Sequence, residues 1–517
     1  MSCHHSSRSP SDPGSDEGCT TRAPRAEHAC RTALRDAAAG GTEAWQSLLY
    51  DRLRDQAVPA FINDDAITPA ASIWTGSRLW LQAFRNADLQ AGDRVVVAMP
   101  PSAAFVQVLV AALWQRLTIA LAPVSASAEL VQSLDARAII HPSARTPHTW
   151  VPDGCAGPLA PPETLRPAET PRTPEARFLL RTSGTTGSAR WFALSDTNVL
   201  SVLASHLPYF ELKHGRVISV LPWSHAFGLV LDLLPAMFSG AEIIRDPEGG
   251  RSAESLLDLR EAWGATHLSA VPLTIRRLLD HDDGQAFLSE LHGGIVGGAP
   301  ISAPLAEALS QTELRVGYGQ TEASPGIALG DPGVWAPNYL GQPLGCTVRL
   351  RNEGELFFRG QNACIGQWTQ DGLHRLDPER WVRTGDRAER RSDGLYFRGR
   401  TDDAFKLMNG RMVNAGPIEA RLKEAFSAAR DAFVWTPDGS HLAVALCWDD
   451  ASESSSARQP SSATVRAHLG PLQDRLDATL FVNPADWPTT PKGSVDRSAV
   501  QSYLSDRVSP ESSSVAS

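Results

Sequence analysis

Short apolar runs alternate with amphipathic stretches of helical length from about residue 43 to residue 399. The run "DRVVVAMP" at 93–100 has the length of a strand, and a helical pattern follows it at 102–116. A second strand pattern, "VISVLPW" at 217–223, precedes a helical pattern at 253–263. Further strands are expected at 137–140, 267–272 and 314–319. Because strands that alternate with helices form parallel sheets covered by helices, the chain is expected to be an α/β protein with layered sheets.

The pattern changes towards residue 400. The segments "GELFFRG" at 354–360 and "GLYFRGR" at 394–400 alternate apolar and polar residues beside glycines, which is typical of antiparallel strands. They predict a small barrel-like section attached to the layered sheets.

A second domain is expected after the segment "GRTDD" at 399–403. Two helices and one strand of their own follow it, at 416–426, 462–476 and 441–448, with a polar surface loop at 451–462. The sequence therefore predicts a large domain at 43–399 and a small, mobile α+β lid domain at 400–505. The polar segments 1–42 and 506–517 are expected to be disordered tails.

Composition excludes several classes of protein. The formal net charge of −10 lacks the basic excess that nucleic-acid binding requires. The seven cysteines are dispersed and show no zinc-ligand spacing, which favours reduced thiols. The apolar run at 103–114 is too short for a membrane span, and the N-terminus lacks the apolar core of a signal peptide. We therefore expect a cytoplasmic protein with neither a nucleic-acid partner nor a membrane span.

The segment "RTSGTTGSAR" at 181–190 follows the apolar run "RFLL" directly. Gly184 and Gly187 free the backbone, so that consecutive N–H groups can form an anion-binding nest. The spacing of a Walker loop is absent. By itself the segment fits either a phosphate-binding loop or an ordinary turn.

Four downstream motifs favour a nucleotide site. They are "GYGQTE" at 317–322, "VRTGD" at 382–386, "GRTDDAFK" at 399–406 and "TTPKGSVDR" at 489–497. Thr321 offers a hydroxyl to a phosphate, Glu322 offers the oxygen ligand that Mg²⁺ prefers, and Asp386 can accept from ribose hydroxyls. Each motif alone also fits a strand end or a turn. Their order and spacing together do not fit that simpler interpretation.

This set of motifs resembles the superfamily of adenylate-forming enzymes, which includes acyl- and aryl-CoA synthetases, adenylation domains of peptide synthetases, and luciferase. The resemblance covers about residues 43 to 505. It implies that a carboxylic acid attacks the α-phosphate of ATP, with Mg²⁺ present, to give an acyl adenylate and pyrophosphate. A nucleophile then takes the acyl group.

The resemblance assigns roles to individual residues. The phosphate loop would cradle the β- and γ-phosphates, Thr321 would bond the α-phosphate, and Glu322 would bind Mg²⁺. Tyr318 would stack on adenine, Asp386 would hold the ribose with Arg400 beside it, and Asp402 would be the hinge of the lid domain. The phosphate loop comprises Thr182, Ser183, Gly184, Thr185, Thr186 and Gly187, followed by Arg190 in place of the usual lysine. The adenine and acyl site would include Gly297, Gly298, Ala299, Pro300 and Gly319.

Two positions depart from the pattern of the superfamily. Ser494 occupies the place of the catalytic lysine, and the nearest lysine is Lys492. A lysine is needed there because negative charge develops as the adenylate forms. We expect Lys492 to take that role, the alternative being a weakened step. Asn409 occupies the place of a glycine that helps form the CoA thiol tunnel, and Gly410 follows it.

The segment "LPWSHAFGL" at 221–229 resembles the one that lines the acyl pocket. His225 stands where amino-acid-activating members carry an aspartate for the α-ammonium group. Without that carboxylate a buried ammonium would lack its partner, so an acid without an α-amino group is expected. His225 and Phe227 would gate or wall the pocket, and the small Gly298 would leave room for a ring or a chain. A packed loop histidine is the alternative for His225.

The leading hypothesis is therefore an ATP-dependent ligase that makes an acyl or aryl adenylate and then a CoA thioester. The acceptor could also be an amine or a carrier-protein thiol. A non-catalytic nucleotide-binding relative is the alternative of another class, suggested by Ser494. A P-loop NTPase is disfavoured because its lysine motif is missing.

Overall fold

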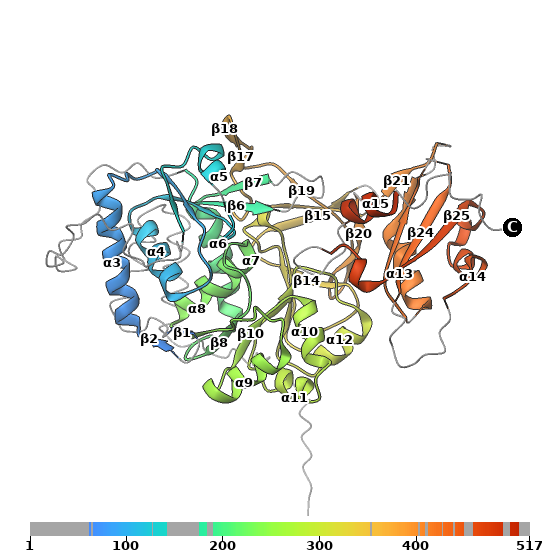
Figure 1. Cartoon of the computed structure of the whole chain (residues 1–517), viewed down its shortest axis with the longest axis horizontal. Coiled ribbons are helices and arrows are strands. Elements are labelled where there is room, and N and C mark those ends of the chain that lie inside the picture. Colours follow the sequence, from blue (N-terminus) through green and yellow to red (C-terminus); the bar gives the residue numbers. More distant parts are fainter. Residues whose placement is uncertain are drawn as a thin grey trace, which may run out of the picture.

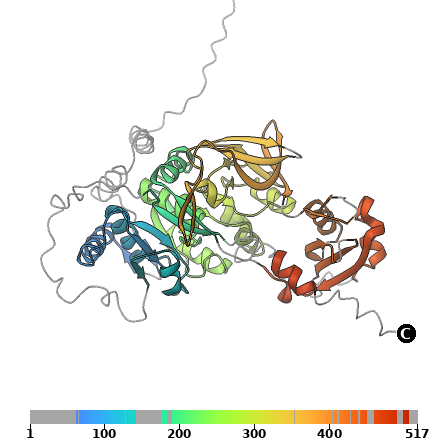
Figure 2. The ribbon, with the colours of Figure 1, turned by 90° about the horizontal axis from the view of Figure 1, so that it is seen from above.

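The structure is a computed structural model. It describes residues 61–63, 66–126, 128–141, 175–182, 190–351, 354–401, 404–408, 412–426, 428–437, 440–448, 459–489 and 497–505. The two expected tails and most of the polar loop at 451–462 lie outside these residues. Figure 1 shows a large α/β body with the C-terminal region, in orange and red, at one end. Figure 2 shows the earliest strands and helices and the C-terminal region at opposite ends of the molecule.

A seven-stranded sheet contains the strands β3 to β7 together with β17 and β18. Its order is β18-β17-β7-β6-β4-β3-β5. The strands β5, β3, β4 and β6 run parallel, as the alternation of strands and helices predicts, whereas β7, β17 and β18 continue the sheet antiparallel. These strands are β3 (Arg94–Val97), β4 (Thr118–Leu121), β5 (Ala138–Ile140), β6 (Phe178–Thr182), β7 (Arg190–Leu194), β17 (Gly366–Thr369) and β18 (Gly372–Arg375).

A five-stranded sheet has the order β10-β8-β9-β1-β2. Its strands are β1 (Phe61–Asn63), β2 (Ala66–Thr68), β8 (Arg216–Ser219), β9 (Glu242–Arg245) and β10 (His267–Ser269). The helices of the body are α3 (Ala70–Asn86), α4 (Ala103–Trp114), α5 (Ala128–Ser133), α6 (Asp196–His206), α7 (Ala226–Gly228), α8 (Leu234–Ser239), α9 (Ala253–Trp263), α10 (Pro272–Leu279), α11 (Gly284–Ser289) and α12 (Ala303–Leu309). A π-helix, η4 (Leu229–Leu233), connects α7 to α8.

An eight-stranded sheet carries most of the expected site. Its order is β11-β12-β13-β14-β20-β19-β16-β15, and its end strands are not paired with each other. The expected barrel-like section is therefore, in the described residues, part of an open sheet. Its strands are β11 (Ile295–Gly297), β12 (Arg315–Tyr318), β13 (Ala328–Leu329), β14 (Tyr339–Pro343), β15 (Thr347–Arg351), β16 (Glu355–Arg359), β19 (Val382–Arg391) and β20 (Gly394–Arg400).

The C-terminal region has a core of its own around a three-stranded sheet. Its helix α13 contacts β20 of the large body. Its elements are β21 (Ala404–Lys406), β22 (Met412–Asn414), α13 (Ala415–Ala425), β23 (Ala429–Trp435), β24 (Leu442–Trp448), α14 (Ser462–Ala467), the 3-10 helix η6 (Gly470–Arg475), β25 (Leu476–Val482) and α15 (Arg497–Ser505).

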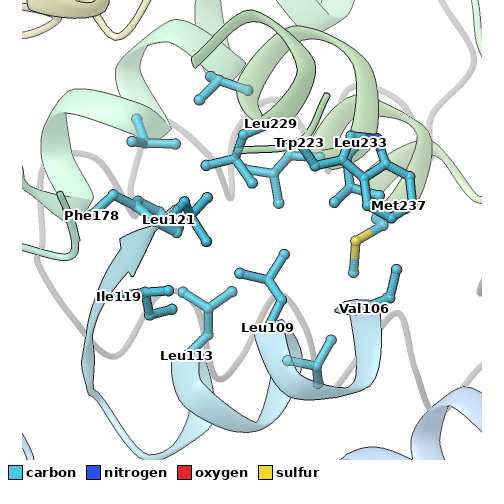
Figure 3. Close-up of a cluster of buried hydrophobic side chains, with 14 of the residues drawn as sticks. Val106, Leu109, Leu113, Ile119, Leu121, Phe178, Trp223, Leu229, Leu233 and Met237 are labelled. Atoms are coloured by element: carbon cyan, nitrogen blue, oxygen red, sulfur yellow. The ribbon is translucent and has the colours of Figure 1, made fainter. Parts of the chain in front are cut away.

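The largest hydrophobic cluster lies between α4 and the segment that runs from Trp223 to α8. Figure 3 shows Val106, Leu109 and Leu113 of α4 facing Trp223, Leu229, Leu233 and Met237, with Phe178 and strand β4 on one side. Nearly every side chain of α4 is buried, because its sequence is apolar on all faces. This core fixes the segment that the sequence assigns to the acyl pocket.

The expected elements are largely confirmed, with local differences. Helix α9 has the expected bounds, and β20 spans the expected residues 394–400. The helix expected at 462–476 is wrong in part: α14 ends at Ala467, and the 3-10 helix η6 replaces the rest. Gly470 has a φ of +56° and Pro471 lacks a backbone N–H, so an α-helix cannot continue through them.

Candidate active site

Three of the expected nucleotide-site residues meet where β12 approaches β19 and β20. The Tyr318 hydroxyl donates to Asp386 Oδ2 at 2.6 Å, and Arg400 Nη1 donates to Asp386 Oδ1 at 2.9 Å. Asp386 and Arg400 face each other across the antiparallel pair β19–β20, so the strand register itself places this ion pair. Thr384 Oγ1 accepts from the Asp386 backbone N–H at 3.0 Å. Donors from two different strands therefore orient the Asp386 carboxylate.

The protonation of this cluster follows from burial and charge. Burial raises the pKa of Tyr318 well above its ordinary value, and the adjacent Asp386 carboxylate adds to that shift. The phenol therefore keeps its proton at neutral pH and acts as a donor. Asp386 is only 7% exposed, and the positive charge of Arg400 offsets part of the cost of its burial. Because a carboxylate can accept at about four lone-pair positions, Asp386 can still bind further hydroxyl groups.

Thr321 and Glu322 begin the 3-10 helix η5 (Thr321–Ala323), shortly after β12. Burial raises the pKa of Glu322, and the positive charges of Arg190 and Arg400 oppose that shift. The Cys364 backbone N–H donates to the Glu322 carbonyl at 2.8 Å, which anchors the turn. Glu322 is therefore a partly buried carboxylate within the electrostatic reach of two arginines.

The phosphate loop itself lies outside the described residues, including Ser183, Gly184, Thr185, Thr186 and Gly187. Its two ends are described. Thr182 at the end of β6 faces Arg190 at the start of β7 in an antiparallel pair, and β6 contacts η5. Thr182 Oγ1 is buried and has no hydrogen-bond partner among the described residues. The loop therefore starts and ends beside Glu322, with a hydroxyl and a guanidinium at its base.

Several other expected residues lie outside the described residues. They are the expected hinge Asp402, the lysine candidate Lys492, Ser494, Asn409 and Gly410. Their roles stay predictions.

The segment from Gly297 to Pro300 follows β11, beside the strand that carries Tyr318. Gly297 pairs with Gly317 across β11 and β12, and Gly298 adopts a φ of +88°. Gly298 and Pro300 are exposed, and Ala299 is half-buried. A Cβ atom at Gly319 would lie 1.3 Å from the Pro325 carbonyl oxygen, so this close approach of two backbones requires glycine. The segment thus presents exposed backbone next to Tyr318.

His225 and Phe227 lie at the start of α7, where the chain enters the π-helix η4. His225 is the residue that precedes α7, and its carbonyl accepts from the Leu229 N–H at 2.9 Å. Phe227 is half-buried and packs against both large hydrophobic clusters of the body. Phe227 is therefore placed at the junction of the two cores, two residues after His225.

The sequence reasoning missed a buried acidic residue close to this segment. Asp232 in η4 accepts from Ser219 Oγ at 2.6 Å, and Ser219 Oγ accepts from Trp223 Nε1 at 3.0 Å. Burial is the largest cause that raises the pKa of Asp232, to about 6. The sequence contains one indication of this residue, a single acidic side chain within the apolar run "LVLDLL". In a regular helix such an acid could equally face solvent, so the pattern alone did not reveal it.

Two negative findings apply to the described residues. No group of three or more His, Cys, Asp or Glu side chains there could hold a metal ion. No helix in the described part of the chain is long and apolar enough to cross a membrane.

Comparison with known proteins identifies a family. The sequence model described as "AMP-binding enzyme" matches residues 81–366, more than half of the chain. Phenyloxazoline synthase MbtB of Mycobacterium tuberculosis is 28% identical over 366 residues, covering 64% of this chain and 25% of that protein. Acyl-CoA ligase SID4 of Ajellomyces capsulatus is 29% identical, covering 50% of this chain and 48% of that protein. The chain thus spans from a quarter to about half the length of these curated relatives.

Solved structures share the fold over nearly the whole length. ATP-bound MatB from Rhodopseudomonas palustris has a TM-score of 0.73 and 19% identity, covering 89% of this chain and 98% of that one. The anthranilate CoA ligase AuaEII in complex with anthranoyl-AMP has a TM-score of 0.69 and 20% identity, covering 88% and 96%. The amide bond synthetase McbA from Marinactinospora thermotolerans has a TM-score of 0.70 and 21% identity, covering 88% and 99%. At these identities the likeness establishes the fold alone.

Proposed function

This chain belongs to the AMP-binding enzyme family, and on that premise we propose that it activates a carboxylic acid with ATP and then acylates the thiol of CoA. The acid would form an acyl adenylate with release of pyrophosphate. The observation that carries this proposal is the cluster of Tyr318, Asp386 and Arg400 beside Glu322. The carboxylates of this cluster can accept from ribose hydroxyls and bind Mg²⁺, and its arginine can donate to phosphates. This combination supports a nucleotide site over a purely structural role.

ATP would bind along the edge that joins β12 to η5. Asp386 would accept from the ribose hydroxyls, with Arg400 fixing the carboxylate from the opposite strand. Tyr318 would present its ring to adenine while its hydroxyl remains bonded to Asp386. Thr182 Oγ1 is buried without a partner among the described residues, which supports a phosphate contact at the base of the loop.

The phosphates would be neutralised by Arg190 and by Mg²⁺. Glu322 would hold the ion, which would supply charge neutralisation at the phosphate oxygens when bound. Arg190 suits phosphate because its planar guanidinium can donate two parallel hydrogen bonds. Thr321, at the start of the same turn, would donate to the α-phosphate.

As the carboxylate attacks the α-phosphorus and the bond to pyrophosphate breaks, negative charge builds on the α-phosphate oxygens and on the leaving pyrophosphate. Lys492 would stabilise that charge from the C-terminal region, and Asp402 would be the hinge that brings the region into position. A preorganised cation at this point stabilises the transition state more than the ground state. The same region would then swing to admit the nucleophile, as lid movements do in other two-step enzymes.

The acid would be an aryl or acyl carboxylic acid without an α-amino group. His225 stands at the position expected for an ammonium-binding aspartate, and a neutral or cationic imidazole offers no such partner. Phe227 would supply an apolar wall, and Gly298 would leave space next to the nucleotide. The anthranilate CoA ligase AuaEII, which shares this fold, holds anthranoyl-AMP, and this supports an aromatic acid as one candidate.

CoA is the proposed acceptor because acyl-CoA ligases recur among the relatives. An amine is the second candidate, supported by the amide bond synthetase with the same fold and by Asn409 in the expected thiol tunnel. A carrier-protein thiol is a third acceptor of the same chemical class as CoA.

The test is pyrophosphate release from ATP with a panel of aryl, short-chain and long-chain acids, with amino acids as the matched control set. Addition of CoA, pantetheine or an amine then identifies what discharges the adenylate. We expect pyrophosphate with at least one acid that lacks an α-amino group, followed by CoA thioester formation. ATP binding by calorimetry without pyrophosphate for any acid would instead identify a non-catalytic nucleotide-binding relative.

A further inference from the structure

Asp232 is the centre of a buried polar network at the π-helix η4. Its Oδ2 atom accepts from Ser219 Oγ at 2.6 Å, and that hydroxyl oxygen accepts from Trp223 Nε1 at 3.0 Å. Asp232, Ser219 and Trp223 are each at most 3% exposed. The network therefore connects η4 to the end of β8 and to the segment that follows it.

Arg245 of β9 holds the same segment from the other side. Its Nη1 atom donates to the Ser219 carbonyl at 2.8 Å and to the Leu221 carbonyl at 2.9 Å. The guanidinium carbon lies 6.0 Å from the centre of the Trp223 ring. The positive charge of Arg245 also offsets part of the burial cost at Asp232.

Apolar contacts also hold the Trp223 side chain in place. Its ring lies 5.3 Å from the Phe105 ring and 5.8 Å from the Phe61 ring, measured between centroids. Figure 3 shows Trp223 beside Leu229 and Leu233, facing α4. Apolar contacts alone would bury this indole, but its N–H group requires an acceptor. The chain from Ser219 to Asp232 supplies that acceptor.

The burial of Asp232 in an apolar helix costs free energy, and the Ser219 hydrogen bond and the charge of Arg245 offset only part of that cost. The Asp232 Oδ1 atom has no hydrogen-bond partner among the described residues. Asp232 also lines a cavity of about 20 Å³ with His267 and Ser269, which is room for about one water molecule. An apolar residue would cost less in a helix that is otherwise apolar. Stability alone therefore does not account for this carboxylate.

We propose that Asp232 is a positioning residue for the acyl pocket: through Ser219 it fixes Trp223, and thereby the segment that carries His225 and Phe227. This inference rests on the proposed function, because it takes the segment 221–229 as part of the acyl pocket. Trp223 lies only two residues before His225, so a rotated indole would displace both pocket side chains. The network would therefore decide which acids bind, and it would leave ATP binding unchanged.

The test compares variants that break the network with variants that preserve it. Trp223→Phe removes the bond from the indole to Ser219, and Ser219→Ala removes that bond together with the bond to Asp232. Both variants keep most of the apolar volume. Asp232→Asn keeps an acceptor and is the conservative variant. We expect Ser219→Ala and Trp223→Phe to raise the KM for the acid about tenfold and to change the ranking of acids. The KM for ATP should stay within about twofold, and Asp232→Asn should resemble the parent protein.

A purely structural role gives a different result. If the breaking variants lower the melting temperature but keep the parent ranking of acids, the inference is overturned. Hydrogen exchange in the full-length chain gives a readout that needs no activity. The amides of residues 220–229 should exchange about tenfold faster in Ser219→Ala, while those of helix α13 in the C-terminal region should not change. An unchanged rate at 220–229 also overturns the inference. If the parent protein releases no pyrophosphate with any acid, the proposed function fails, and the exchange experiment still decides whether the network holds the segment.

Discussion

Tyr318 donates a hydrogen bond of 2.6 Å to Asp386, a residue 68 positions later in the chain. The bond joins the end of β12 to β19, two strands of one sheet that are not neighbours in its order. Arg400 approaches the second oxygen of the same carboxylate. Three of the motifs that were expected to bind a nucleotide, far apart in sequence, thus converge on one acceptor group.

Asp386→Ala should weaken ATP binding strongly. The change removes a charged acceptor and leaves Arg400 and Tyr318 without this buried partner. Loss of a hydrogen bond to a charged group costs about 1.5–3 kcal/mol, so the KM for ATP should rise roughly 10- to 100-fold. The measurement is the KM for ATP in pyrophosphate release.

A second pair on the same sheet provides the matched control. The Tyr396 hydroxyl donates to Asp393 Oδ2, also at 2.6 Å, in the β19–β20 turn. Asp393→Ala removes a bond of the same kind outside the candidate site, and its KM for ATP should stay near that of the parent. Equal effects of the two substitutions would contradict the assignment of Asp386 to the ribose.

Arg190→Lys should keep most of the activity, and Arg190→Ala should lose most of it. The positive charge faces phosphate in the proposed complex and opposes the raised pKa of Glu322. We expect kcat to fall about 10- to 100-fold in the alanine variant and only a few fold in the lysine variant. The exposed Arg181, which pairs with Trp191 in the same hairpin, gives the control variant Arg181→Ala. A loss as large at Arg181 would indicate an unspecific effect of charge.

The sequence predicted most of the helices and strands and the local motifs. Helix α9 and strand β20 follow directly from periodicity, and the pairing of Asp386 with Arg400 follows once β19 and β20 are known to be antiparallel. The pairing of β17 with β7 could not be predicted from the sequence, because these strands lie about 175 residues apart and no local pattern indicates such a pairing.

The polar network around Asp232 was also beyond local reasoning. It joins Ser219, Asp232 and Arg245, which lie on three different elements, and its burial depends on α4 packing from outside. A π-helix changes which side chains of a segment share one face, so the ordinary helical period does not place Asp232. Only the packed structure shows which polar groups it faces.

Lys492→Ala should slow adenylate formation strongly, because this lysine is proposed to replace the one missing at Ser494. Removing one preorganised charge partner from a transition state costs about 10²- to 10³-fold in rate. Ser494→Lys is the complementary variant: in the Lys492→Ala background it should restore part of the rate. The readout is acid-dependent pyrophosphate release at saturating ATP. Full activity of Lys492→Ala would show that another group stabilises the charge.

The pH dependence of stability should contain a clear contribution from His206. Burial lowers the pKa of His206 to about 4, against its ordinary 6.5, so the folded chain resists protonation where the unfolded chain accepts it. The contribution of His206 to the free energy of unfolding is therefore fully present above pH 6.5. As the pH falls from about 6.5 to 4, this contribution decreases by about 1.4 kcal/mol per pH unit. The pKa of His267 is also lowered to about 4, and the pKa of Asp232 is raised to about 6, which makes the protein more stable as the pH falls. Both groups are present in the parent and in the His206→Phe variant, so their effects cancel when the two proteins are compared. The measurement is the free energy of unfolding in urea at pH 7 and at pH 5. The loss of stability between pH 7 and pH 5 should be about 2 kcal/mol smaller in His206→Phe than in the parent. Identical differences in the two proteins would mean that folding does not lower the pKa of His206.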